Sequence, residues 1–453
     1  MLNNSKNFAN NPLSSLCDEL KENYRISPEK YKAYNVKRGL RNPDGTGVVA
    51  GITNICNVHG YVINEGDKAS VEGKLTYRGI NVNDIIENCK KENRFGFEEV
   101  VYLLLFGSLP TKENLEKMHR HLSGHRELPE YFAEDMIIKA PSPNVMNKLA
   151  RSVLALYSYD DNPDDISPEN LLRQSLILIS QLPTVMVYAY QVKRRQYDQK
   201  SMYFHPINPE HWTAEFILSS MRADKKFTDE EAKLLDLCLC LHAEHGGGNN
   251  SAFTARVLSS SGTDTYSTIA AAIGALKGHK HGGANIKVTR MLEDFKENLP
   301  STSDADVKEY LQKTLLKQTG DRSGLIYGMG HAVYTLSDPR CVILKKEAEK
   351  IAQEKDLYDD FLLLDKIERL TPQVLYDMKG IEHDVCANVD LYSGLIYRAL
   401  GIPEDLYTPI FAIARLAGWC AHRMEEIMTS SKIIRPAYKA TVKDKLYIPI
   451  DKR

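Results

Sequence analysis

The sequence of residues 242–250 is His-Ala-Glu-His-Gly-Gly-Gly-Asn-Asn, and that of residues 279–285 is His-Lys-His-Gly-Gly-Ala-Asn. One apolar helical stretch joins these two motifs. A histidine beside a run of glycines can approach a ligand closely, because the backbone there carries no side-chain bulk. The pair of motifs therefore predicts the rim of an active site.

Outward from the motifs, the pattern of apolar residues is overwhelmingly helical. Thr228-Asp-Glu-Glu231 is a capping box that opens a predicted helix, and the glycines after His245 end it. Further helices are predicted over residues 266–276 and over residues 284–299, where Pro300 closes the helix. The remaining predicted helices cover residues 168–194, with a kink at Pro183, and residues 307–319, 341–355, 374–378, 393–400 and 408–430.

Strand patterns are few and short, at residues 48–55, 61–63 and 325–327. We therefore predict an all-α fold. The sharpest changes in composition flank residues 285–392, which predicts a smaller helical domain there. Residues 1–284 and 393–453 would then form a larger helical domain into which the smaller one is inserted.

Composition limits the partners that the chain can have. Its 453 residues include 58 basic and 60 acidic ones, so no global field points to nucleic acid or to a membrane surface. Eight scattered cysteines without a CxxC pair indicate reduced thiols packed in the core. The first twenty residues do not resemble a targeting segment, and no apolar run reaches the length of a membrane span. We expect a cytoplasmic protein.

His245 lies at the predicted C-terminal end of a helix, where exposed carbonyls favour a positive imidazolium. Such a group would bind a carboxylate or a polarised carbonyl. Capping of the last carbonyls by His242 and His245 is an equally good explanation of these residues alone. A metal site is disfavoured, because no third ligand accompanies the two histidines at a telling spacing.

His281 has the opposite setting, because it precedes the start of the next predicted helix. The positive end of the helix dipole there disfavours imidazolium. A neutral imidazole can donate a hydrogen bond to a developing enolate oxygen, as in triosephosphate isomerase. A simple turn residue is the alternative for one histidine beside two glycines.

Further candidates lie downstream. Asp390 precedes an apolar helix, so its carboxylate is either a helix cap or a base for a carbon acid. Arg415 lies inside an apolar run, and a buried guanidinium needs either an internal carboxylate or a substrate carboxylate as its partner. Arg340 and Arg435, taken singly, are typical of surface residues, and His331 completes the set.

The order and spacing of these motifs strongly resemble the citrate synthase family. The resemblance covers almost the whole chain, and chance agreement of so many ordered motifs is negligible. The motifs are Gly-Lys-Leu-Thr-Tyr77-Arg78-Gly79, Glu-Glu-Val-Val-Tyr-Leu-Leu-Leu-Phe-Gly107-Ser-Leu-Pro110-Thr, Leu-His-Ala-Glu-His245 with Asn-Ser-Ala-Phe-Thr254, His281-Gly-Gly-Ala-Asn285, Tyr-Gly-Met-Gly330-His331-Ala-Val-Tyr334 with Asp338-Pro339-Arg340, Asn388-Val-Asp390 and Arg435-Pro436.

The resemblance implies condensation of acetyl-CoA with oxaloacetate, followed by hydrolysis of the citryl thioester to citrate and CoA. It assigns the base to Asp390, the stabilisation of the enol oxygen to His281, and the activation and protonation of the oxaloacetate carbonyl to His331. It implies no metal and no cofactor. It also implies a homodimer and closure of the smaller domain onto the substrates. The residues that it assigns to the carboxylates of oxaloacetate are His245, Arg340, Arg415 and Arg435, the last in the site of the partner subunit.

The chain departs from the family pattern in two places. Many members carry basic residues for the CoA phosphates shortly after the third histidine, where this chain has Thr335 and Leu336. Conversely, His279-Lys280 replaces the usual apolar or proline pair before the second histidine. We hypothesise that Lys280, with Lys277, contacts CoA phosphate; a solvated lysine is the equal alternative.

Two other functions compete with citrate synthesis at this stage. A 2-methylcitrate synthase would use propionyl-CoA, and one methylene changes pocket discrimination by only about 1–3 kcal/mol. A helical scaffold that has lost catalysis is disfavoured, because every catalytic position is intact.

Overall fold

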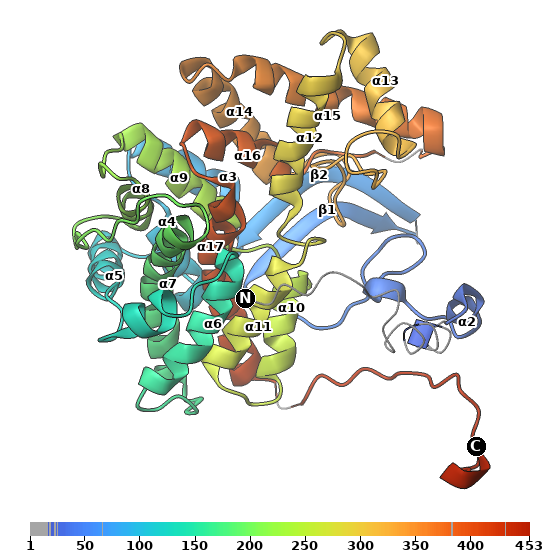
Figure 1. Ribbon diagram of the computed structural model, residues 1–453, viewed down its shortest axis with the longest axis horizontal. Coiled ribbons are helices and arrows are strands. Elements are labelled where there is room, and N and C mark those ends of the chain that lie inside the picture. Colours follow the sequence, from blue (N-terminus) through green and yellow to red (C-terminus); the bar gives the residue numbers. More distant parts are fainter. Residues whose placement is uncertain are drawn as a thin grey trace. The chain divides into compact units, whose positions relative to one another are not determined.

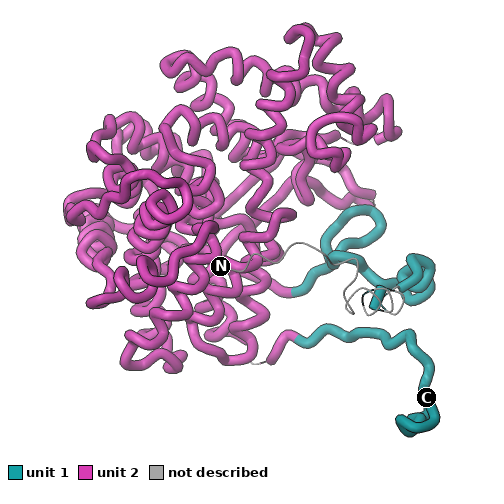
Figure 2. Tube along the Cα trace, viewed as in Figure 1, with its two compact units in different colours: residues 1–50, 435–453 teal, residues 51–434 magenta. Residues whose placement is uncertain are grey.

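The computed structural model describes residues 26–65, 67–381, 384–430 and 432–453, together with residues 17, 20, 21 and 24. The chain divides into two compact units (Figure 2): residues 1–50 and 435–453 form unit 1, and residues 51–434 form unit 2. The first sixteen residues, which carry most of the segment that we judged unlike a targeting sequence, lie outside the described part.

Among the described residues of unit 1, the elements are short. These are α2 (Pro28–Ala33) and the 3₁₀ turns η1 (Arg38–Leu40) and η5 (Ile450–Lys452). Its two chain segments meet at Lys30, whose ammonium donates to the Thr441 hydroxyl at 3.4 Å. Arg435 is exposed at the start of the second segment.

Unit 2 begins with one antiparallel sheet. Its strands β1 (Cys56–Asn64), β2 (Asp67–Tyr77) and β3 (Ile80–Asn81) lie in that order. Cys56 pairs with Tyr77 at the buried end of the β1–β2 ladder, which places Tyr77 in the core. The rest of unit 2 is helical, which confirms the predicted all-α class.

The helices of unit 2 form two groups in the chain (Figure 1). The first group is α3 (Val82–Lys91), α4 (Phe97–Phe106), α5 (Lys112–Gly124), the π-helical η2 (Ala133–Ile138), α6 (Val145–Leu156), η3 (Tyr157–Tyr159), α7 (Pro168–Gln196), α8 (Thr213–Met221), α9 (Asp229–His242), α10 (Asn250–Ser259) and α11 (Thr265–Lys277). The second group is α12 (Ala284–Asn298), α13 (Asp304–Leu315), α14 (Pro339–Glu354), α15 (Tyr358–Lys379) and α16 (Asp390–Ala399), followed by η4 (Glu404–Leu406) and α17 (Tyr407–Thr429).

Helix α17 comes after the second group in the chain but packs at the centre of the first. It packs against α4, α6, α7, α9, α10 and α11, and most of its side chains are buried (Figure 1). Helix α7 contains an 18-residue window with a mean hydropathy of 1.3, which makes the helix long and apolar enough to cross a membrane. From the sequence we had expected no run of that length. Because 78% of that window is buried inside the molecule, α7 fits a core helix.

Helices α12–α16 pack mainly on one another. α14 and α12 lie against α16, and α13 lies against α15. This group carries the predicted smaller domain, and its predicted boundaries at residues 285 and 392 both lie within unit 2. The boundaries therefore remain a prediction.

The helix predictions agree with the structure better than the strand predictions. Residues 48–55 and 325–327 are not strands, and β1 begins only at Cys56. We missed β2, whose alternating polar and apolar residues are interrupted by Gly73. The predicted helix at residues 374–378 is only the end of α15, which continues through Pro372.

Candidate active site

The first histidine motif begins where α9 ends. The Tyr77 hydroxyl lies 3.0 Å from the Cys240 carbonyl and 3.2 Å from the Glu244 carbonyl, so the strand β2 caps the C-terminal end of α9. Nε of Arg415 donates to the His242 carbonyl at 2.6 Å. These groups supply the hydrogen bonds that a helix end requires. Our alternative, capping by the histidines, is therefore wrong.

His242 is a core residue. Its side chain is fully buried and stacks on Phe411 with ring centroids 4.3 Å apart. Neither ring nitrogen has a hydrogen-bond partner among the described residues. Burial, with the charges of Arg340 and Arg415, lowers the pKa of His242 well below its ordinary value, so the ring is neutral.

His245 is the histidine of this motif that faces the other candidates. Its ring meets the His331 ring edge-on, with centroids 5.0 Å apart, and its Nε2 has no partner within the described chain. Burial and the charge of Arg340 lower the pKa of His245 well below its ordinary value. The predicted imidazolium is therefore wrong for the ligand-free site, because burial beside arginines outweighs the helix-end carbonyls.

The hydrogen bonds of His331 fix its tautomer. Its Nδ1 accepts from the backbone N–H groups of Val333 and Tyr334, both at 3.0 Å. An Nδ1 that accepts carries no proton, so the neutral ring carries its proton on Nε2. The Tyr334 ring stacks on His331 at 4.6 Å and holds its orientation.

Asp390 lies next to the loop that carries His331, because hydrogen bonds join the two segments. The backbone around Met329 pairs with Ala387, and Nδ2 of Asn388 donates to the Gly330 carbonyl at 2.9 Å. Oδ1 of Asn388 accepts from the Asp390 N–H at 3.0 Å, at the first turn of α16. Val389 is the N-cap residue of α16 and makes no side-chain capping hydrogen bond, so Asp390 is not a cap and its carboxylate is available for another role.

Asp390 has an acid strength suited to a base near neutral pH. Burial raises the pKa of Asp390 to about 6, although the charges of Arg340 and Arg415 lower it. A carboxyl group with this pKa is ionised at neutral pH, yet it is a stronger base than an ordinary aspartate.

Two buried arginines supply the positive charge. Arg340 donates from Nε and NH2 to Asp338 at 3.0 and 2.7 Å. Arg415 uses Nε for the His242 carbonyl, while its buried NH1 has no partner in the part of the chain that the structure describes. The internal carboxylate that we considered for Arg415 is thus absent from its described hydrogen bonds, and a ligand anion could take NH1.

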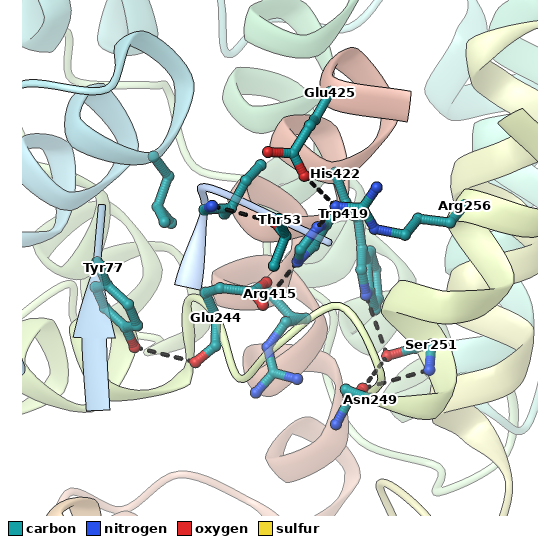
Figure 3. Close-up of polar contacts among 12 residues, drawn as sticks. Thr53, Tyr77, Glu244, Asn249, Ser251, Arg256, Arg415, Trp419, His422 and Glu425 are labelled. Carbon is teal, nitrogen blue, oxygen red and sulfur yellow. Dashed lines mark hydrogen bonds and ion pairs between the residues drawn. The ribbon is translucent and has the colours of Figure 1, made fainter. Parts of the chain in front are cut away.

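His281 approaches from the second motif. Burial, with the charge of Arg415, lowers the pKa of His281 to about 4, so the predicted neutral imidazole agrees with this pKa. Its Nε2 lies 3.0 Å from Oγ of Ser251, which also accepts from Nε1 of Trp419 at 3.1 Å and contacts Oδ1 of Asn249 at 2.9 Å (Figure 3). The Ser251 hydroxyl thus has one proton for two acceptors, Asn249 and the imidazole.

The structure brings six of the predicted residues together. Arg415 acts electrostatically on His281 and Asp390, and both Arg340 and His331 act on His245. Lys277, His279 and Lys280 are exposed beside the second motif. Arg435 belongs to unit 1 and therefore lies outside the unit that holds the six.

Sequence reasoning missed the residues that hold the site. Ser251, Trp419 and Glu244 are buried and polar or aromatic, and we gave them no role. The signal available was the spacing of Arg415, Trp419 and His422 along one helix, which places them on one face. No group of three possible metal ligands occurs among the described residues. The six residues that lie together include two arginines, the carboxylate of Asp390 and two histidines with lowered pKa, His245 and His281.

Comparisons with known proteins agree on one family. The family model for the citrate synthase C-terminal domain matches residues 42–437. The citrate synthase of Synechocystis sp. is 35% identical over 81% of this chain and 84% of its own length. Among solved structures, citrate synthase of Thermotoga maritima covers 92% of this chain and 99% of its own, with 31% identity and a TM-score of 0.72.

A second solved structure holds ligands. It is the ternary complex of carboxymethyl coenzyme A and oxaloacetate with citrate synthase of Thermoplasma acidophilum, with 25% identity, a TM-score of 0.74 and coverage of 92% of this chain and 99% of that one. The match of the family model over most of the chain and the identity with whole relatives lead to one conclusion. The chain belongs to the citrate synthase family.

Proposed function

We propose that this acyltransferase condenses acetyl-CoA with oxaloacetate and water to give citrate and CoA. The observation that carries the proposal is a pair of buried nitrogen atoms beside Asp390 without partners among the described residues: Arg415 NH1, which is a donor, and His245 Nε2, which is a donor when it carries the proton of the neutral ring. Buried polar groups are rarely left unpaired, so such donors favour an anionic ligand. The Thermoplasma acidophilum relative was solved with oxaloacetate and a CoA analogue, which supports the same substrates here.

Oxaloacetate would bind through its two carboxylates. Arg415 NH1 and His245 Nε2 offer charge-assisted and neutral hydrogen bonds from buried positions. Asp338 occupies two of the N–H donors of Arg340, which leaves the others for the substrate. Arg435 of a second subunit would complete the site, so we propose a homodimer.

Carbon–carbon bond formation would begin at Asp390. Its carboxylate takes a proton from the acetyl methyl group, and a neutral His281 donates a hydrogen bond to the enol oxygen. For that donation the imidazole proton must be on Nδ1, so Nε2 must accept a hydrogen bond from the Ser251 hydroxyl. The new nucleophilic carbon attacks the oxaloacetate carbonyl, while His331, protonated on Nε2, gives a proton to the carbonyl oxygen.

Hydrolysis of the citryl thioester by water would then release citrate and CoA. Every step uses side chains of this protein, and we propose that no metal or cofactor takes part. Lys280 and Lys277 are exposed next to His281, where they could contact a CoA phosphate. We also propose that helices α12–α16 close over the substrates as the smaller domain, residues 285–392, and that the enzyme works in the cytoplasm.

The acyl-CoA preference decides between citrate and 2-methylcitrate synthesis. The experiment is release of CoA, measured with a thiol reagent, when oxaloacetate is supplied with acetyl-CoA or with propionyl-CoA. We expect kcat/KM to be higher with acetyl-CoA. A higher value with propionyl-CoA would make the enzyme a 2-methylcitrate synthase, and no release with either would contradict the proposal.

The assignment of the base has its own test. Asp390→Asn keeps the shape of the side chain but removes its basicity, so kcat should fall by about 10²–10⁴-fold. Calorimetric binding of oxaloacetate should remain, because Arg340, Arg415 and His245 are unchanged. Turnover close to that of the wild type would refute Asp390 as the base.

A further inference from the structure

One face of α17 holds the first histidine motif and Ser251, the residue that follows it. Arg415, Gly418, Trp419 and His422 follow one another at helical spacing, so they line one side of the helix. Three of them bond to residues 242–251: Arg415 to the His242 carbonyl, Trp419 to Ser251, and His422 to Glu244 (Figure 3). This face therefore connects both catalytic loops to a single rigid element.

Glu244 is the least expected member of this contact. It directly precedes His245 and is fully buried, with Oε1 2.8 Å from Nε2 of His422. Its Oε2 has no partner among the described residues and lies against the backbone of α17, where a Cβ on Gly418 would be only 2.1 Å away. Helix α17 can come this close only because residue 418 has no side chain.

The charge of Glu244 is maintained by its surroundings. Burial raises the pKa of its carboxyl, but the contacts with His422, the charge of Arg415 and the Gly246 N–H outweigh burial and hold the pKa below its ordinary value. A buried carboxylate is costly unless it is paired and hydrogen-bonded. Its negative charge also acts on Arg415, the substrate arginine on the same helix.

His422 can hold Glu244 in only one protonation state. NH2 of Arg256 lies 2.7 Å from Nδ1 of His422, and a guanidinium only donates, so Nδ1 must accept. The single proton of the neutral ring is then on Nε2 and points at Glu244. Arg256 is held in turn by Glu426, at 3.0 Å, and by Glu425, whose Oε1 accepts from the Asn54 N–H at 2.8 Å.

We propose that Glu244 and His422 are positioning residues for the oxaloacetate subsite: they lock the loop of His245 against the helix of Arg415, so that the two unpaired donors meet one dianion. The proposal rests on the proposed function, since it assigns those donors to oxaloacetate. Stability alone is a weak reason for this series of buried polar contacts, because apolar residues of similar volume can often replace buried ion pairs without loss of folding stability. Neither Glu244 nor His422 touches the reacting carbon atoms.

Two substitutions of one residue give the test. The Nε2 of a glutamine can occupy the place of the imidazole Nε2 and donate to Glu244, whereas the shorter asparagine reaches only the place of Nδ1. We expect His422→Asn to raise the KM for oxaloacetate about tenfold and His422→Gln to restore it to within about threefold of the wild type. The kcat and the KM for acetyl-CoA should change by less than about threefold in both.

A third substitution reaches Glu244 from the other side. Gly418→Ala would place a methyl group 2.1 Å from Oε2 and 2.6 Å from the Ala243 carbonyl oxygen, so it displaces the segment that carries His245 while leaving Arg256 and His422 intact. It should also raise the KM for oxaloacetate, and it supplies the test if His422→Asn fails to fold. Arg423→Gln is the matched control, because Arg423 follows His422 on α17, is equally buried, and bonds instead to Thr265 and Thr268.

The outcomes separate the two proposals. If the wild type turns over acetyl-CoA and oxaloacetate but His422→Asn and Gly418→Ala both keep its KM for oxaloacetate, only the positioning role is overturned. The same follows if Arg423→Gln raises this KM as much as His422→Asn does, or if kcat falls in parallel with it. If the wild type neither turns over nor binds oxaloacetate by calorimetry, the proposed function fails and the positioning role falls with it.

Discussion

The two histidine loops have similar sequences but different surroundings. Residues 242–245 of the His245 loop are buried, and Tyr77, Arg415 and His422 hold them through their carbonyls and through Glu244. The loop of His281 is exposed on one side, at residues 277–280, and its contacts are the Ser251 hydroxyl and the bond from Thr408 to the Gly282 carbonyl. Both loops nevertheless depend on α17.

The difference indicates that the His245 loop is suited to binding an anion and the His281 loop to donating a hydrogen bond from a neutral group. A buried loop with unpaired donors and two arginines is suited to an anion, which replaces the lost water around those donors. A half-exposed loop with a neutral imidazole is suited to an oxygen that only begins to gain charge. The glycines also differ: Gly246 has φ +85 and turns the chain after His245, whereas Gly282 lies against Leu276 and Thr408.

The largest expected effect comes from changing each histidine in turn. His281→Gln should lower kcat by about 10²–10³-fold, because it removes a donor to the developing charge, with little change in the KM for oxaloacetate. His245→Gln should instead raise the KM for oxaloacetate about 10- to 100-fold. Steady-state kinetics with each substrate varied would check both, and an equal phenotype in the two variants would break the comparison.

The pH profile tests whether activity follows the ionisation of Asp390 rather than that of a histidine in one of the loops. Below a pKa of about 6 the Asp390 carboxyl is protonated and cannot take a proton, so kcat/KM should fall about tenfold for each pH unit below pH 6. His281, with a pKa of about 4, stays neutral through this range. Full recovery of activity on return to pH 7.5 excludes unfolding, and a flat profile down to pH 5 would contradict the base.

Ser251 joins the second loop to α17, so its hydroxyl is the next feature to remove. Ser251→Ala leaves Nε2 of His281 and Nε1 of Trp419 without their shared partner, and kcat should fall about two- to tenfold. The KM for oxaloacetate should stay constant. Ser180→Ala, a buried serine that bonds within α7, is the control for lost stability, which thermal melting measures. If Ser251→Ala changed only the KM for oxaloacetate, the assignment of Ser251 to the His281 loop would be contradicted.

The smallest effect is expected at the exposed side of the second loop. Lys280→Ala should raise the KM for acetyl-CoA about two- to fivefold at low salt, since an exposed ion pair contributes little and is screened. Lys200→Ala, another exposed lysine, should leave this KM unchanged. If Lys280→Ala and Lys277→Ala both bind acetyl-CoA like the wild type, the solvated alternative holds for both lysines.

Prediction from the sequence succeeded where signals are local. The capping box at Thr228 starts α9 as expected, because both of its reciprocal bonds form between neighbours in the chain. Strands depend on partners far along the sequence, so β2 was missed, and residues 325–327 were taken as a strand although the bridge to Ala387 lies two residues further on, at Met329. The charge of His245 was predicted wrongly because burial, and then the charge of Arg340, 95 positions later, lower its pKa.

The sequence alone determined the all-α class, the family and the candidate residues, because helix periodicity and ordered motifs are written along the chain. Only the tertiary structure decided which groups are charged and which hold the others. Burial together with the arginines made His245 neutral, and burial against the effect of the arginines made Asp390 more basic. The packing of α17 brought Glu244, His422 and Ser251 behind the two loops. These outcomes depend on distance and exclusion of water, which residues far apart in the chain acquire only on folding.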